Sequence, residues 1–220
     1  MKDSNLPTRQ ECFKIIKKYH VPSHILDHSQ SVTKLAVFLA NRLIEKGITV
    51  DIALVERACL LHDMVRICDF NEVDYSKFKE PVTETDKATW DQIRTKYKGT
   101  SHEEAAYEIL KEKYPALALT IKKHRYMAIS EQGRPNTWEE KLVYYADMRV
   151  MEDKIVSLKE RLLDGHKRNA FLHDPETLSK IDTAKVDLQI YRLEAEIFKQ
   201  AGLSPIEVTN EFIDSYSEHT

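Results

Sequence analysis

Cysteine and long apolar runs are both scarce in this sequence. The three cysteines, Cys12, Cys59 and Cys68, are odd in number and lack C-x-x-C spacing, which is typical of buried thiols in a reducing compartment and excludes a dense disulfide framework. No run approaches the roughly 18 apolar residues that a membrane span needs, and the first residues, MKDSNLPTRQE, contain no apolar signal core. These absences predict a soluble, cytoplasmic protein without a membrane partner.

Positive charge is not in excess either. The chain has 33 Lys and Arg against 36 Asp and Glu, a formal net charge of -3, and both signs are mixed along its length. A nucleic-acid duplex as the main partner would favour a basic stripe, which the sequence lacks. We therefore expect a small-molecule partner.

Glycine is also rare, and its positions indicate helices. Each of the five glycines follows or separates a helix-like segment, as C-terminal caps and turns do. Between them apolar residues recur at spacings of three and four, and no stretch alternates convincingly with the period of two that is typical of strands. The sequence thus predicts an all-α domain with one sizeable core. The expected helices are 8–19, 22–46, 51–66, 86–97, 101–113, 115–127, 137–168 with room for a break, 175–200, and a short one from 204.

Capping signals and composition mark some boundaries of these helices. Ser101 and Thr137 each precede a glutamate by three residues, a pattern in which a hydroxyl and a carboxylate satisfy the free backbone donors of a first turn. Residues 67–85 are polar, contain Pro81 and lack periodicity. We predict that they form a loop that borders a site.

Near the C-terminus, apolar residues form one helical stripe that predicts a packing seam. The expected partner is the chain's own helix around Ile155, Leu158 and Leu162, in preference to a second subunit. The stripe is too short to establish an oligomer, so monomer and homodimer both stay open. The residues of this seam are Ile181, Ala184, Leu188, Tyr191, Ala195 and Phe198.

The segment ACLLHDMVR, residues 58–66, places His62 and Asp63 inside an apolar helical run. A carboxylate among such residues needs a counter-charge, strong hydrogen bonds or a metal, because burying it unpaired is very unfavourable. Asp147 lies in a second apolar run, KLVYYADMRV, and poses the same problem. One bound cation could resolve both.

The order of these residues resembles the HD-domain superfamily of metal-dependent phosphohydrolases, whose pattern is H, then HD, then a distant D. His28 supplies the first histidine, and the resemblance covers roughly residues 22–156. It implies an HD-domain helical bundle with additional C-terminal helices: a core of residues 1–156, which includes the N-terminal helix, and a helical extension of residues 157–220 packed on the same domain. His102 and His124 match additional histidines that are typical of dinuclear members of the superfamily.

The resemblance implies two divalent ions and a hydrolytic reaction. Imidazole and carboxylate ligands without a thiolate suit Mn²⁺ or Fe²⁺, with Co²⁺, Ni²⁺, Zn²⁺ and Mg²⁺ as alternatives, better than a closed structural zinc. Such ions lower the pKa of bound water toward about 7 and polarise phosphoryl oxygens. We therefore expect hydrolysis of a phosphate ester or anhydride in a nucleotide or another small phosphorylated metabolite. The implied ligands are His28, His62, Asp63 and Asp147 for one ion, and Asp63, His102 and His124 for the other.

Three arginines are candidates for binding the phosphate of the substrate. Arg66 lies one helical turn after Asp63, where many family members have a lysine, and is predicted with Asp63 to be catalytic. Arg125 and Arg149 follow His124 and Asp147 and are further candidates, although each could form an ordinary ion pair. The motif reads HDMV where HDIG is common, and no GYP signature occurs, so the substrate stays open.

Two other functions remain compatible with the same residues. A di-iron site on this fold resembles that of oxygenases, and a regulatory domain could bind a nucleotide without turning it over. Oxygen uptake with a polyol or phosphonate would indicate the first. Ligand binding without turnover over a wide metal panel would indicate the second.

Overall fold

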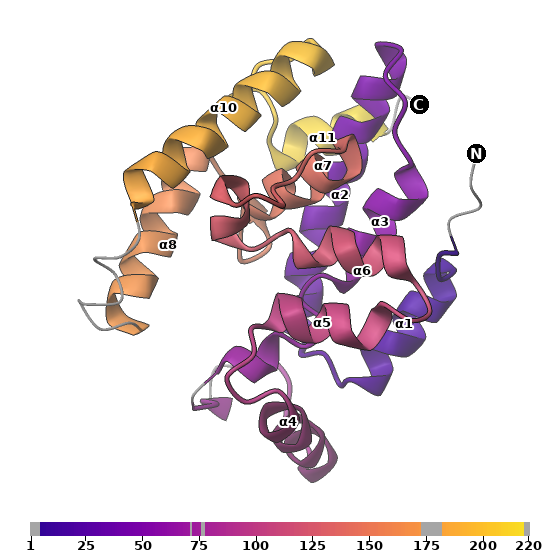
Figure 1. Cartoon of the computed structure of the whole chain (residues 1–220), viewed down its shortest axis with the longest axis vertical. Helices are drawn as coiled ribbons and strands as arrows, with labels where there is room; N and C mark the ends of the chain where they lie inside the picture. The colour runs from indigo at the N-terminus through magenta and orange to yellow at the C-terminus, as the bar shows by residue number, and fades with distance from the viewer. Residues whose placement is uncertain (1–4, 71, 76–77, 173–181, 218–220) are drawn as a thin grey trace.

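The computed structural model describes residues 5–70, 72–75, 78–172 and 182–217, and this part of the chain is mostly helical (Figure 1). The predicted all-α class is therefore confirmed. The elements are α1 (Arg9–Lys18), α2 (Ser23–Glu45), α3 (Ile52–Leu61), η1 (Arg66–Asp69), α4 (Glu84–Lys96), α5 (His102–Leu110), α6 (Pro115–Lys122), η3 (Tyr126–Ser130), α7 (Trp138–Asp147), β1 (Val150–Met151), β2 (Lys154–Ile155), α8 (Leu158–Leu172), α10 (Thr183–Ala201) and α11 (Asn210–Ser217).

The centre of the core is α2, which packs against α3 and α7. Its apolar residues recur at helical spacing, and Val32, Leu35 and Leu39 are completely buried. Helix α3 also contacts α6 and α7, and α6 packs on α5. This arrangement brings the ends of four helices and the first turns of α2 close together. Among the described residues, no helix combines the length and apolarity that crossing a membrane requires.

Several predicted helix starts are confirmed by their caps. The Thr137 hydroxyl accepts a hydrogen bond from the Glu140 backbone N–H, and the Glu140 carboxylate accepts one from the Thr137 N–H, which completes a capping box. The Ser101 hydroxyl accepts from the Glu104 N–H at the start of α5. These caps fix the first turns of the helices that carry Asp147 and His102.

Two predicted helices end earlier than the sequence pattern indicated. Helix α3 ends at Leu61 instead of residue 66, so His62 and Asp63 lie in the turn that follows it. Helix α6 ends at Lys122 instead of residue 127, and η3 follows separately. In each case a histidine ring just after the helix bonds a backbone carbonyl of the last turn: His62 Nδ1 bonds Cys59 O, and His124 Nδ1 bonds Ile121 O. In a continuing helix this carbonyl would accept a backbone N–H instead, so the side chain competes with the helix.

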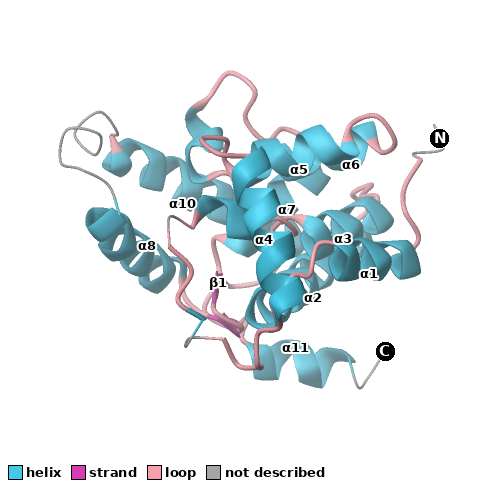
Figure 2. Cartoon of the chain, turned by 90° about the horizontal axis from the view of Figure 1, so that it is seen from below, coloured by secondary structure: helices cyan, strands magenta, loops and turns pink. Residues whose placement is uncertain are grey.

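The expected helix 137–168 is interrupted by a two-stranded antiparallel hairpin, the short magenta segment in Figure 2. Its strands, β1 and β2, have two residues each, too few to show a period of two in the sequence. Glu152 in the hairpin turn has a φ of 56°, which is uncommon for a residue other than glycine. The carbonyl oxygen of Glu152 lies 2.8 Å from His28 Nδ1, so the turn also supports the first turns of α2.

Most of the predicted C-terminal seam is wrong, because Phe198 is its only buried residue in the described part of the chain. On α10, Leu188 and Tyr191 are 50% and 40% exposed. The buried face is shifted around the helix and packs mainly on η3, α2 and α7, more than on the helix around Leu158. The predicted stripe and the observed buried stripe of α10 both have apolar residues at spacings of three and four. Periodicity alone could therefore not choose between them. Residues 173–181, including Ile181 and the start of the helix expected over 175–200, lie outside the described residues. The buried residues of α10 are Val186, Ile190, Leu193, Ile197, Phe198 and Ala201.

Candidate metal centre

Six predicted ligands come together from five helices. His28 lies in the second turn of α2, and His102 and Asp147 are the first residue of α5 and the last of α7. His62 and Asp63 follow the end of α3, and His124 follows the end of α6. Helix ends and turns can present such side chains without breaking a hydrogen-bonded helix interior. Five of the six are buried: His62, Asp63, His102, His124 and Asp147.

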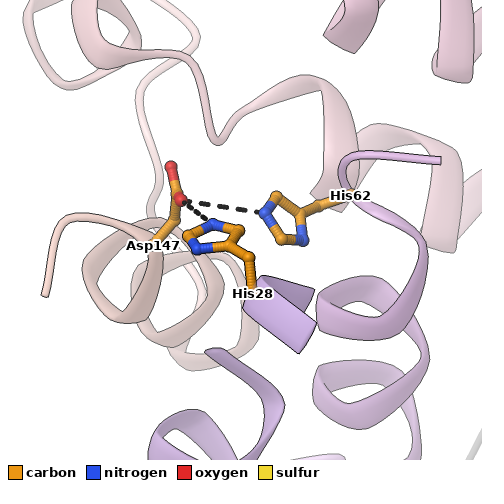
Figure 3. Close-up of side chains that lie close together, drawn as sticks. All are labelled: His28, His62 and Asp147. Atoms are coloured by element: carbon orange, nitrogen blue, oxygen red, sulfur yellow. Dashed lines mark hydrogen bonds and ion pairs between the residues drawn. The ribbon is translucent and has the colours of Figure 1, made fainter. Parts of the chain in front are cut away.

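His28, His62 and Asp147 form the first group (Figure 3). The Asp147 Oδ1 atom lies 3.0 Å from His28 Nε2 and 3.7 Å from His62 Nε2. One ligand atom from each residue lies within 4.8 Å of the other two. These three residues could hold one metal ion.

Asp63 connects this group to a second pair of histidines. Its Oδ2 atom lies 3.7 Å from His62 Nε2, whereas its Oδ1 atom lies 3.0 Å from His102 Nε2 and 3.8 Å from His124 Nε2. The two Nε2 atoms of His102 and His124 face each other at 3.0 Å. Asp63 therefore lies where a carboxylate that bridges two ions would have to lie.

The other ring nitrogen of every histidine in the cluster is held by an acceptor. A carbonyl or carboxylate oxygen can only accept, so each Nδ1 carries the hydrogen and each neutral ring presents a lone pair at Nε2. Metal-binding histidines in proteins are oriented in this way. The four contacts are His28 Nδ1 with Glu152 O at 2.8 Å, His62 Nδ1 with Cys59 O at 2.7 Å, His124 Nδ1 with Ile121 O at 2.6 Å, and His102 Nδ1 with Asp69 Oδ2 at 2.5 Å.

The atoms in the middle of the cluster lack hydrogen-bond partners. Neither His62 Nε2 nor Asp63 Oδ1 has one in the described part of the chain, although both are buried. Imidazole lone pairs repel one another and also repel nearby carboxylate oxygens, unless a cation or extra protons lie between them. The donor set of imidazole nitrogens and carboxylate oxygens, with no thiolate, fits divalent ions such as Mn²⁺ and Fe²⁺.

The pKa values of the cluster also indicate that it favours positive charge. Burial opposes ionisation of Asp63, but His62, Arg66 and His102 hold the pKa of this carboxyl well below 3.8. Burial and Arg66 oppose protonation of His102, yet Glu103 and Asp63 outweigh them and raise its pKa to about 9. Without a metal, His102 thus takes up a proton where the cluster requires a cation.

Arg66 lies at the edge of the cluster. Its Nη1 atom is 3.0 Å from His102 Nε2 and 3.7 Å from Asp63 Oδ1, and its side chain is 39% exposed. The guanidinium group therefore reaches both the cluster and solvent. This is the position expected of a group that binds an incoming phosphate.

The other two candidate arginines are engaged elsewhere. Arg125 is 47% exposed and pairs with Glu131. Arg149 is 2% exposed, and its three guanidinium nitrogens donate to Tyr145, Glu194 and the carbonyls of three further residues, which corrects the expectation that it binds substrate. These carbonyls belong to Val156, Pro205 and Val208.

Two carboxylates at the site were not predicted. Asp69 accepts from both the backbone N–H and the Nδ1–H of His102, at 2.9 and 2.5 Å. Glu103 is 7% exposed, and its Oε2 atom lies 3.4 Å from His102 Nδ1. Neither is in an apolar run, so the signal that indicated Asp63 and Asp147 was missing. The acidic residue directly after His102 was the only available hint.

Replacing Asp69 tests whether it orients His102. We expect Asp69→Asn to weaken metal binding by about 10- to 100-fold, as is typical when a partner of a metal-bound histidine is lost. Calorimetric titration of the metal-free protein with Mn²⁺ measures this affinity. Asp86→Asn is the matched control, because Asp86 also bonds a histidine Nδ1, that of His20 at 2.6 Å, and also caps a helix. Equal affinities for the two variants would contradict this role.

Comparison with known proteins agrees with this geometry. The sequence model of the HD domain family matches residues 25–151, a range that contains all six predicted ligands. The chain is also similar to a tRNA (cytidine(56)-2'-O)-methyltransferase of Picrophilus torridus, with 28% identity over 182 residues, which cover 77% of this chain and 43% of that protein. It thus spans less than half the length of this relative. No solved structure matches. Because the family match covers more than half of the chain, the protein belongs to the HD domain family, a superfamily of metal-dependent phosphohydrolases.

Proposed function

We propose that the protein hydrolyses a phosphate ester or anhydride of a nucleotide or another small phosphorylated metabolite, with two divalent ions at the cluster. The observation that supports this most strongly is the orientation of the four histidines. All four Nδ1–H groups are bonded away from the centre, so all four Nε2 lone pairs face Asp63 and Asp147. Such a set is suited to cations and has no equivalent use in a metal-free core.

His28, His62, Asp63 and Asp147 would hold one ion, and Asp63, His102 and His124 the other. When bound, the ions lower the pKa of a coordinated water and stabilise the charge that develops on the phosphoryl oxygens. Arg66 supplies what the ligands do not, a cation that can donate two hydrogen bonds to a phosphate. Its ion pair with Asp63 holds it beside the reacting group.

The name of the relative from Picrophilus torridus widens the range of substrates worth testing. That name describes methyl transfer to tRNA, and the similarity spans only 43% of that protein. Methyl transfer is therefore not part of this proposal. RNA phosphate esters are reasonable additional substrates beside nucleotides, dinucleotides and sugar phosphates.

Phosphate or nucleoside release tests the proposal directly. Protein stripped of metal and reloaded with Mn²⁺ or Fe²⁺ should release product from one substrate class at least about 100-fold faster than stripped protein, because metal stabilisation of a phosphoryl transition state contributes several kcal/mol. His28→Gln should lose this activity. His166→Gln should keep it, since His166 lies on α8 and pairs with Asp187. No release from any substrate with either metal would contradict the proposal.

A further inference from the structure

We propose that Glu103 is a further metal ligand, which completes the second ion position with His102, His124 and Asp63. This inference rests on the metal centre of the proposed function and extends it. One oxygen of Glu103, one ring nitrogen of His102 and one of His124 lie within 4.8 Å of one another. They form a group comparable to that of His28, His62 and Asp147.

The carboxylate of Glu103 is buried, so a missing hydrogen-bond partner at this group is significant. The side chain is 9% exposed, and its Oε2 atom has no hydrogen-bond partner among the described residues. A buried carboxylate oxygen without a partner is strongly unfavourable, so such atoms in proteins are normally paired or bound to a metal. A bound cation would therefore satisfy this oxygen of Glu103.

The neighbouring histidine does not supply this cation when a metal is bound. The Nδ1–H group of His102 lies 2.5 Å from Asp69 Oδ2 but 3.4 Å from Glu103 Oε2. Its hydrogen bond therefore goes to Asp69. A metal ion on the Nε2 lone pair keeps the ring neutral, and Glu103 would then face an uncharged imidazole.

The basic side chains nearby are already paired with other carboxylates. Glu103 lines a hollow of about 230 Å³ together with three of them. Each of the three has its own acidic partner, so none of the three is paired with Glu103. The pairs are Lys122 with Glu104 at 2.8 Å, Lys123 with Glu140 at 2.7 Å, and Arg125 with Glu131.

Adding Glu103 gives both ion positions the same kinds of ligand. The first position has two imidazoles, Asp147 and a share of Asp63. Without Glu103 the second position has two imidazoles and only a share of Asp63. The affinity of a metal site depends on the charge of its ligands. The Glu103 carboxylate therefore helps the second position to retain an ion despite repulsion from the ion at the first position.

Metal stoichiometry tests the inference without any substrate. We expect metal-free wild-type protein to bind two Mn²⁺ ions and Glu103→Gln to bind the second at least 10-fold more weakly, as measured by calorimetry and by metal analysis after gel filtration. In electron paramagnetic resonance, the spectrum of an isolated Mn²⁺ ion should replace that of an exchange-coupled pair. Glu104→Gln is the matched control, because Glu104 is 40% exposed and pairs with Lys122.

The outcomes separate this inference from the hydrolase proposal. Glu103→Asp, which keeps the charge, should bind the second ion more tightly than Glu103→Gln, and circular dichroism checks that both are folded. Two ions bound by Glu103→Gln with wild-type affinity would overturn the role of Glu103, whatever the activity. One ion bound by both wild type and Glu103→Gln with equal affinity would overturn it too. Tight binding of two Mn²⁺ ions by the wild type without hydrolysis would contradict only the proposed function.

Discussion

Asp63→Asn is expected to abolish both metal retention and hydrolysis, the largest effect of any single change at the site. Asp63 has one oxygen facing His62 and the other facing His102 and His124, so its loss affects both ion positions at once. An amide has one acceptor oxygen and no charge. Activity should fall by about 10³-fold or more, because losing even one oxyanion-hole hydrogen bond costs about 10²–10³ and Asp63 faces both ion positions.

Thermal melting separates this loss from unfolding. Adding Mn²⁺ at about 100 times its dissociation constant should stabilise the wild type by about 2.7 kcal/mol, a rise of roughly 5–10 °C in Tm for a chain of this size. Metal-free Asp63→Asn should melt cooperatively and show no such rise. Asp91→Asn, an exposed aspartate on α4 that pairs with Arg94, should behave as the wild type. A Mn²⁺-dependent rise in the Asp63 variant would contradict the bridging position.

The clustering of these histidines and aspartates could be predicted from the sequence because buried charge is conspicuous there. Asp63 and Asp147 lie in apolar runs, and His28 precedes a clear apolar stripe. Side chains that need a cation are thus recognisable before their partners are known. The helical periodicity around them predicted the core helices, since burial of α2 follows the same spacing.

The supporting residues of the site could not be predicted in this way. Asp69 lies in a polar segment, and its bonds to His102 depend on how η1 meets the start of α5. The Glu152 carbonyl beside His28 is a backbone group in a hairpin turn, which side-chain patterns do not report. Arg149 gave a misleading signal, because its place two residues after an expected ligand says nothing of where its guanidinium points.

Replacing Arg149 should therefore damage stability and leave the site intact. Arg149 is 2% exposed, and its side chain joins the end of α7 to Glu194 on α10 and to the segment before α11. Arg149→Met would leave the largely buried Glu194 carboxylate and the carbonyl acceptors without this donor. Breaking one side of a buried ion pair costs about 3–5 kcal/mol, so we expect the metal-free Tm to fall by roughly 6–20 °C.

A double variant tests the cause of this loss. Glu194→Gln removes the charge that Arg149→Met leaves unpaired, so the double variant should recover part of the lost stability, as coupled partners do in a double-mutant cycle. Arg192→Met, on the exposed face of α10, should change the unfolding free energy by less than about 0.5 kcal/mol. If Arg149→Met instead kept its Tm and bound substrate more weakly, the guanidinium would act at the site after all. Its hydrogen bonds to Tyr145, Pro205 and Val208 make the loss of stability the expected result.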